Sequence, residues 1–93
     1  MQGSIRADQF EHVLTTLQQH YRELMVVYRQ DWRSEDDKTV ARQNLTESIS
    51  TARQTVKGLQ GTQEPQLRQL MSQLTVQSEL ADDSLKHPEQ LRR

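Results

Sequence analysis

The chain contains no cysteine among its 93 residues, and it has few aromatic residues, glycines or prolines. Without thiols it forms neither disulfide bonds nor thiolate metal sites. No run of apolar residues approaches the roughly 20 that a membrane-spanning helix needs. Residues 1–8 are polar and lack the apolar core of a signal peptide. From these absences we expect a cytoplasmic protein that does not cross a membrane.

Neither sign of charge dominates the sequence. The formal net charge is −1, and acidic and basic residues are spread evenly along the chain, so no segment is basic enough by itself to attract phosphate. Hydrophobic residues make up 32% of the chain, and the mean hydropathy is −0.94. Such a chain buries only a small core. We therefore expect self-association or a partner protein to contribute to its stability.

All four aromatic residues lie in the first third of the chain, on one stripe with three leucines. The spacing alternates between four and three residues, which is typical of a helix whose apolar face packs against other helices. The members of this aromatic stripe are Phe10, Leu14, Leu17, Tyr21, Leu24, Tyr28 and Trp32. The pattern predicts a helix over about residues 9–33. Before it we expect a flexible N-terminus, residues 1–8, with Asp8 as the helix N-cap.

A second helix is predicted over about residues 35–57. Ser34 followed by three acidic residues is typical of an N-cap and a first helical turn. We therefore expect a break before it, although one helix continuing through Ser34 is the alternative. Gly58 fits the left-handed position that follows a helix, and Leu59 fits the hydrophobic contact next to it.

A third helix is predicted over about residues 64–81. Thr62 is a possible N-cap, and Pro65 is tolerated in a first turn. The Asp82-Asp83 pair and the later Pro88 predict the end of this helix, with residues 83–93 as a frayed tail. The fold class is therefore all-α. Residues 9–82 form one domain, either an antiparallel helical hairpin or a three-helix bundle with coiled-coil-like packing, and we expect it to be oligomeric.

Residues that could support catalysis or bind a metal do not form a recognisable motif. His12 and His20 point about 80° apart on a helix and His87 is remote, so we interpret them as surface residues. Adjacent carboxylates at residues 36–37 and 82–83 are explained by helix ends and solvation. No nucleophile motif or phosphate-binding loop is present. We expect a protein that is not an enzyme, with no cofactor, metal or small-molecule substrate.

The aromatic stripe itself has two interpretations. It is either the core of a self-contained bundle or a face on which another helix docks. Tyrosine and tryptophan dominate such interfaces because they combine a large contact area with a hydrogen-bonding tip. We therefore expect a non-catalytic interaction module, of the adaptor, assembly-factor or small-chaperone type. It would bind a protein partner, itself, or both through this stripe.

A nucleic-acid-associated regulator is the alternative function. Arg22, Arg29 and Arg33 lie on one side of the first predicted helix and could contact phosphates. However, Glu11 and Glu23 belong to the same helix, and the predicted turn after it is acidic and lacks glycine, unlike a helix-turn-helix. The same mixture of charges argues against binding to a membrane surface. We therefore consider nucleic acid the less favoured partner.

Overall fold

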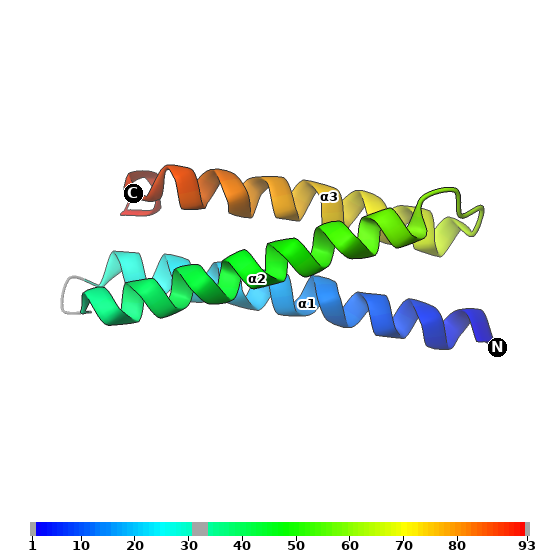
Figure 1. The fold of residues 1–93 in the computed structure, drawn as a ribbon, viewed down its shortest axis with the longest axis horizontal. Helices are drawn as coiled ribbons and strands as arrows, with labels where there is room; N and C mark the ends of the chain where they lie inside the picture. The colour runs from blue at the N-terminus through cyan, green and yellow to red at the C-terminus, as the bar shows by residue number, and fades with distance from the viewer. Residues whose placement is uncertain (1, 31–33, 93) are drawn as a thin grey trace.

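The computed structural model describes residues 2–30 and 34–92, with side chains for residues 10–30 and 34–90. The described residues form the helices α1 (Gln2–Arg29), α2 (Glu35–Leu59) and α3 (Pro65–Lys86), followed by the short 3-10 helix η1 (Pro88–Arg92). The three long helices run in alternating directions, and each packs against the other two (Figure 1). The all-α prediction is confirmed, and the architecture is a three-helix bundle rather than a two-helix hairpin.

The bundle is long and narrow. Its principal dimensions are 48 × 20 × 18 Å, and its radius of gyration is 14.7 Å. A compact chain of this length would have a radius of gyration of about 12 Å. Because the helices lie side by side along nearly their whole length, a large share of the chain stays at the surface. Of the helices in the described ranges, none combines the length and the apolar character that a membrane span requires.

The junction between α1 and α2 is the predicted break. Ser34 is the N-cap of α2, and its hydroxyl oxygen accepts a hydrogen bond from the Asp37 amide at 3.2 Å. Three carboxylates follow in the first turn, where the helix dipole favours negative charge. The prediction that the second helix begins separately is therefore confirmed. Trp32 and Arg33 lie outside the described residues, and α1 ends at Arg29.

The end of α2 differs from the prediction. The helix continues through Gly58 and Leu59, and the residue with positive φ is Gly61, at 86°. The assignment of the left-handed position to Gly58 was wrong. Leu59 is buried against Leu67, and extending the helix brings this side chain into the core. Burial of one leucine, about 1.5–3 kcal/mol, outweighs the cost of about 1 kcal/mol for a glycine inside a helix.

The start of α3 agrees with the prediction in part. Pro65 occupies the first turn, as expected, but the N-cap residue is Glu64 and not Thr62. The Thr62 hydroxyl oxygen instead accepts a hydrogen bond from the Glu64 amide at 3.4 Å, just ahead of the helix. Thr62 therefore stabilises the turn that leads into α3.

Two helices extend beyond their predicted ends. α1 begins at Gln2, so Asp8 lies within the helix and is not its N-cap. α3 runs through the Asp82-Asp83 pair to Lys86. The Asp82 carboxylate is bound by Arg53 of α2 at 3.5 Å and by Lys86 at 3.2 Å, which offsets the unfavourable helix propensity of aspartate. Beyond it η1 packs against α1 and α3, in the segment predicted as a tail.

The core runs along the axis of the bundle. Its largest fully buried side chains come from all three long helices: Leu17, Leu24, Leu45 and Leu74. α2 contributes small buried residues between its larger ones, namely Ala41, Ser48 and Ala52. These small side chains let the bulky residues of neighbouring helices approach α2.

Candidate functional site

The described part of the aromatic stripe lies against the core. Leu17 and Leu24 are fully buried. The other described members are partly buried and pack against the core cluster: Phe10, Leu14, Tyr21 and Tyr28. Trp32, the last member, lies outside the described residues. The stripe therefore packs within the chain, and what it offers to a partner is limited to the exposed edges of its partly buried members.

Tyr21 joins α1 to α3. Its phenol oxygen accepts a hydrogen bond of 3.0 Å from the hydroxyl group of Ser84, which is buried. The polar tip of this tyrosine, which an interface would need as a hydrogen-bonding group, is therefore bonded within the chain.

Tyr28 joins α1 to α2. Its phenol oxygen accepts a hydrogen bond of 3.1 Å from Nη1 of Arg42. The ammonium group of Lys38 lies 5.6 Å from the centre of the ring, within the range of a cation–π interaction. Both tyrosines of the stripe thus have intramolecular partners, which favours the interpretation of the stripe as core.

The arginines of the alternative nucleic-acid site are not gathered into a basic patch. Arg22 and Arg29 are exposed on α1, and Arg33 lies outside the described residues. Arg22 lines a groove that also contains Glu23 and Asp37. Carboxylates this close to the cation weaken the attraction that it exerts on phosphate.

His20 differs from its predicted place on the surface. It is half-buried between α1 and α2, and its Nδ1 atom is hydrogen-bonded to the hydroxyl group of Ser48. His12 and His87 are exposed, as expected. In the part of the chain that the structure describes, no three His, Cys, Asp or Glu side chains are grouped closely enough to hold a metal ion.

A groove between α1 and α2 presents apolar side chains to solvent. Val26 of α1 and Val40 of α2 are 41% and 54% exposed. Both line a hollow of about 490 Å³ with Val27 and Ala41, which are buried. We call this feature the valine groove. Its position close to the α1–α2 turn places it at the end of the bundle where α2 begins.

The sequence alone did not predict that Val26 and Val40 lie together. Val26 and Val40 lie off the apolar stripes of their own helices, so neither is needed for the core of the bundle. Pairing them requires the register between two antiparallel helices, and that register depends on contacts such as Tyr28 with Arg42. The signal available in the sequence was an apolar residue that lies outside the apolar stripe of its helix. Such a residue is expected at the surface, but its position does not show which residue of another helix lies beside it.

The geometry defines a class, an antiparallel three-helix bundle with an apolar surface groove. Comparisons of the chain with protein families, with curated proteins and with solved structures found no match.

Proposed function

We propose that this chain is a non-catalytic protein-interaction module, of the adaptor, assembly-factor or chaperone type, that pairs with a second copy of itself through the valine groove. The observation that carries the proposal is the exposure of Val26 and Val40 beside the buried Val27 and Ala41. A clustered apolar surface of this kind is typical of an interaction site, whereas a single exposed valine needs no explanation.

The shape of the bundle supports a partner. The elongated bundle has a narrow core made mainly of leucines and alanines. The aromatic side chains lie at the edge of that core and are only partly buried. Covering the valine groove would add apolar burial at about 25 cal/mol per Å², which is a useful gain for a chain with so small a core.

The charges around the groove favour a second copy as the occupant. Arg22 lies on the lining of the groove together with Glu23 and Asp37, so the same surface carries both signs. A two-fold axis through the groove places the same surface on both sides of the interface. Arg22 of each copy can then pair with Glu23 of the other, with the valines at the centre of the interface. The helices of the two copies would pack in a coiled-coil-like arrangement.

The nucleic-acid alternative is less well supported. Arg22 shares the lining of its groove with Glu23 and Asp37, which weaken its attraction for phosphate. If that function were correct, binding of an oligonucleotide would weaken steeply with salt, and an Arg22→Gln, Arg29→Gln variant would lose it. The absence of enzyme activity and the cytoplasmic location stay predictions from the sequence.

The proposal is tested by the solution mass. We expect the wild-type protein to form a dimer in light scattering at micromolar to millimolar concentration. A Val26→Gln, Val40→Gln variant should raise the dimer dissociation constant by about tenfold or more, because four valines leave the interface. Glutamine is a better helix former than valine, so the variant should keep its helicity by circular dichroism.

The matched control is Val76→Gln, which changes an equally exposed valine, at 53%, on α3. This variant should dimerise like the wild type. A wild-type protein that stays monomeric at every concentration would overturn the proposal. So would a Val76→Gln variant that dissociates while the groove variant does not.

A further inference from the structure

A second groove runs between α2 and α3. One hollow of about 400 Å³ is lined by Ile49 and Leu85, and a neighbouring one of about 290 Å³ is lined by Val56. Arg53 and Lys57 line both hollows, so the two form one continuous groove along α2. We call it the basic groove. Its lining differs from that of the valine groove.

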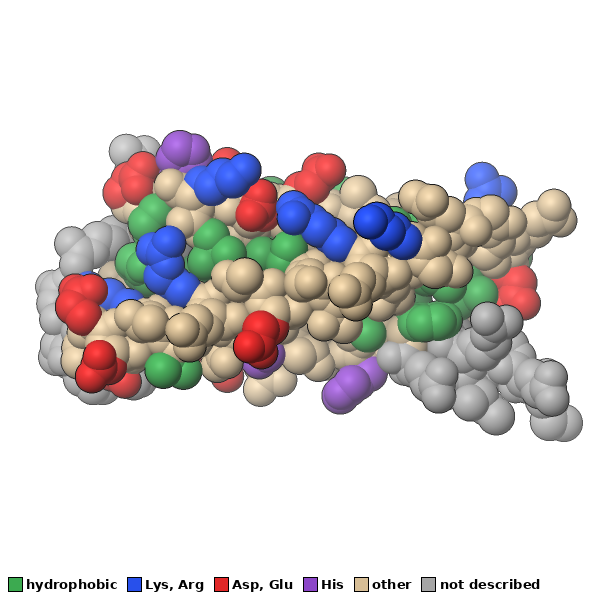
Figure 2. Space-filling view, viewed as in Figure 1, with side chains coloured by type: hydrophobic (Ala, Val, Ile, Leu, Met, Phe, Trp, Pro, Cys, Tyr) green, Lys and Arg blue, Asp and Glu red, His purple; other side chains and the backbone are tan. Residues whose placement is uncertain are grey.

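Basic side chains follow this groove from one end to the other. Arg42, Arg53 and Lys57 share one face of α2, because they stand at positions i, i+11 and i+15. Figure 2 shows Lys and Arg side chains in a row across this face of the molecule, with hydrophobic side chains visible between them.

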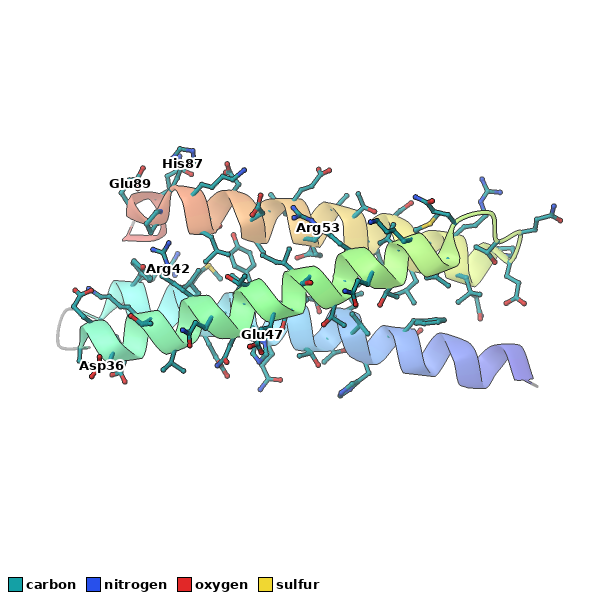
Figure 3. The ribbon with its side chains drawn as sticks, in the orientation of Figure 1. Asp36, Arg42, Glu47, Arg53, His87 and Glu89 are labelled. Carbon is teal, nitrogen blue, oxygen red and sulfur yellow. The ribbon has the colours of Figure 1, made fainter. Side chains whose placement is uncertain are left out.

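The charges of α2 are separated across the helix. Figure 3 shows Arg42 and Arg53 on the side of α2 that faces α3, and Asp36 and Glu47 on the opposite side. The chain as a whole has a net charge of −1. A basic groove on a slightly acidic protein is therefore a local feature that overall composition does not reveal, and it favours an anionic partner.

Two carboxylates, Asp82 and Glu79, line the groove together with Arg53 and Lys57. Two further cations contact its lining, Lys86 at Asp82 and Arg42 at the Leu85 carbonyl oxygen, so cations outnumber carboxylates. Asp82 is bound by Arg53 and Lys86, and its side chain is 30% exposed, compared with 53% for Arg53 and 68% for Lys86. The cations thus reach farther into solvent than the carboxylate that binds them. Lys57 has no carboxylate partner within ion-pair distance among the described residues.

The floor of the groove is apolar. Ile49 is buried, and Val56 and Leu85 are half-buried. Arg42 is held at one end, because its Nη2 atom donates a hydrogen bond of 3.4 Å to the Leu85 carbonyl oxygen while Nη1 binds Tyr28. A guanidinium group has five N–H donors, so Arg42 keeps donors for a further acceptor.

We propose that the basic groove binds an acidic amphipathic helix of a partner protein. The partner helix lies along α2 and α3 and extends the bundle from three helices to four. Its apolar residues cover Ile49, Val56 and Leu85. A pair of carboxylates one turn apart faces Arg53 and Lys57, and a third carboxylate about three turns away faces Arg42, since α2 rises 1.5 Å per residue. This goes beyond the self-association proposed above and uses a different surface.

A helix fits these observations better than a nucleic acid does. Duplex DNA carries one charge per roughly 1.7 Å of axis, and a continuous row of phosphates would pass over Glu79 and Asp82, which also line the groove. A helix can place carboxylates only opposite the cations. It also buries the apolar floor, which phosphates leave uncovered.

The test uses a fluorescein-labelled synthetic helical peptide of about 18 residues, with leucines on one stripe and glutamates spaced to meet Arg42, Arg53 and Lys57. Binding to the 93-residue chain is measured by fluorescence anisotropy at low salt. We expect an Arg53→Gln, Lys57→Gln variant to bind the peptide about fivefold or more weakly, the effect of losing two exposed ion pairs.

Two controls accompany this variant. Arg68→Gln removes an exposed cation that lines neither groove and should leave peptide affinity unchanged. A peptide with every glutamate replaced by glutamine should lose most of its affinity. The Arg53→Gln, Lys57→Gln variant should keep the helicity and solution mass of the wild type, so its result does not depend on whether the chain self-associates.

Three outcomes would overturn the proposal. The acidic peptide does not bind the wild-type protein, or it binds the Arg53→Gln, Lys57→Gln variant and the wild type equally well. The third outcome is that a single-stranded oligonucleotide displaces the peptide and binds more tightly than the peptide. That result would identify the groove as a nucleic-acid site.

Discussion

The hydroxyl group of Ser84 on α3 donates a hydrogen bond of 3.0 Å to the phenol oxygen of Tyr21 on α1, across 63 residues of sequence. Ser84 is buried, and Tyr21 packs partly buried against the core. The bond closes the bundle by joining its first and third helices at the point where α3 passes beyond its predicted end. It also places a member of the aromatic stripe in a contact within the chain.

Removing this hydrogen bond should destabilise the bundle. We expect Tyr21→Phe to lower the free energy of unfolding by about 1 kcal/mol, because the buried Ser84 hydroxyl group loses its acceptor. The measurement is a urea titration followed by circular dichroism. Tyr28→Phe is the matched control, since its partner Arg42 is exposed and regains water when the bond is lost. A larger loss for Tyr28→Phe than for Tyr21→Phe would contradict the assignment.

The two glycines near the C-terminal end of α2 should respond oppositely to substitution by alanine. Gly61 has φ 86°, so Gly61→Ala should destabilise the protein by about 1–2 kcal/mol. Gly58 lies inside α2, where an added methyl group meets no atom within 4 Å, so Gly58→Ala should stabilise by about 0.5–1 kcal/mol. Thermal melts of the two variants check both signs. If Gly58→Ala destabilised the protein and Gly61→Ala stabilised it, Gly58 would be the residue in the left-handed conformation.

Substitution of a core leucine by alanine should destabilise the protein far more than the same substitution of an exposed leucine. Leu24, a member of the aromatic stripe, is fully buried, and Leu24→Ala should cost about 2–5 kcal/mol. Leu80 on α3 is 49% exposed, and Leu80→Ala should change stability by no more than about 0.5 kcal/mol. Urea titrations measure the free energy of unfolding of both variants. If Leu24→Ala is already unfolded without urea, the cost of the substitution exceeds the stability of the wild type. Similar costs for the two variants would argue against the stripe as core.

The sequence predicted the parts of this fold that depend on neighbours along the chain. Ser34 and the acids after it mark the start of α2 because an N-cap is a local interaction between a side chain and the next turn. The alternating spacing from Phe10 to Tyr28 predicts which face of α1 is apolar, since periodicity alone sets that face. Pro65 marks the first turn of α3 for an equally local reason.

Two of the wrong predictions depended on contacts between helices. Gly58 resembles a helix end, yet the burial of Leu59 carries α2 past it. Asp82 resembles a helix breaker, yet Arg53 of another helix binds it. In each case a contact with a residue distant in sequence stabilised the helix by at least as much as the local propensity disfavoured it. The pattern of a single sequence does not show such contacts.

The same distinction between local and tertiary determinants applies to the candidate surfaces. The amino-acid order determined that the chain is helical and which residues form the apolar stripe of α1. Only the packing of the three helices decided that Val26 and Val40 line one groove and that Arg53, Lys57 and Leu85 line another. The same packing places Arg42 and Lys86 beside that second groove, where they bind Leu85 and Asp82. The reason is physical: periodicity sets the direction of a side chain around its own helix, whereas a groove between two helices exists only once their register and rotation are set by tertiary contacts.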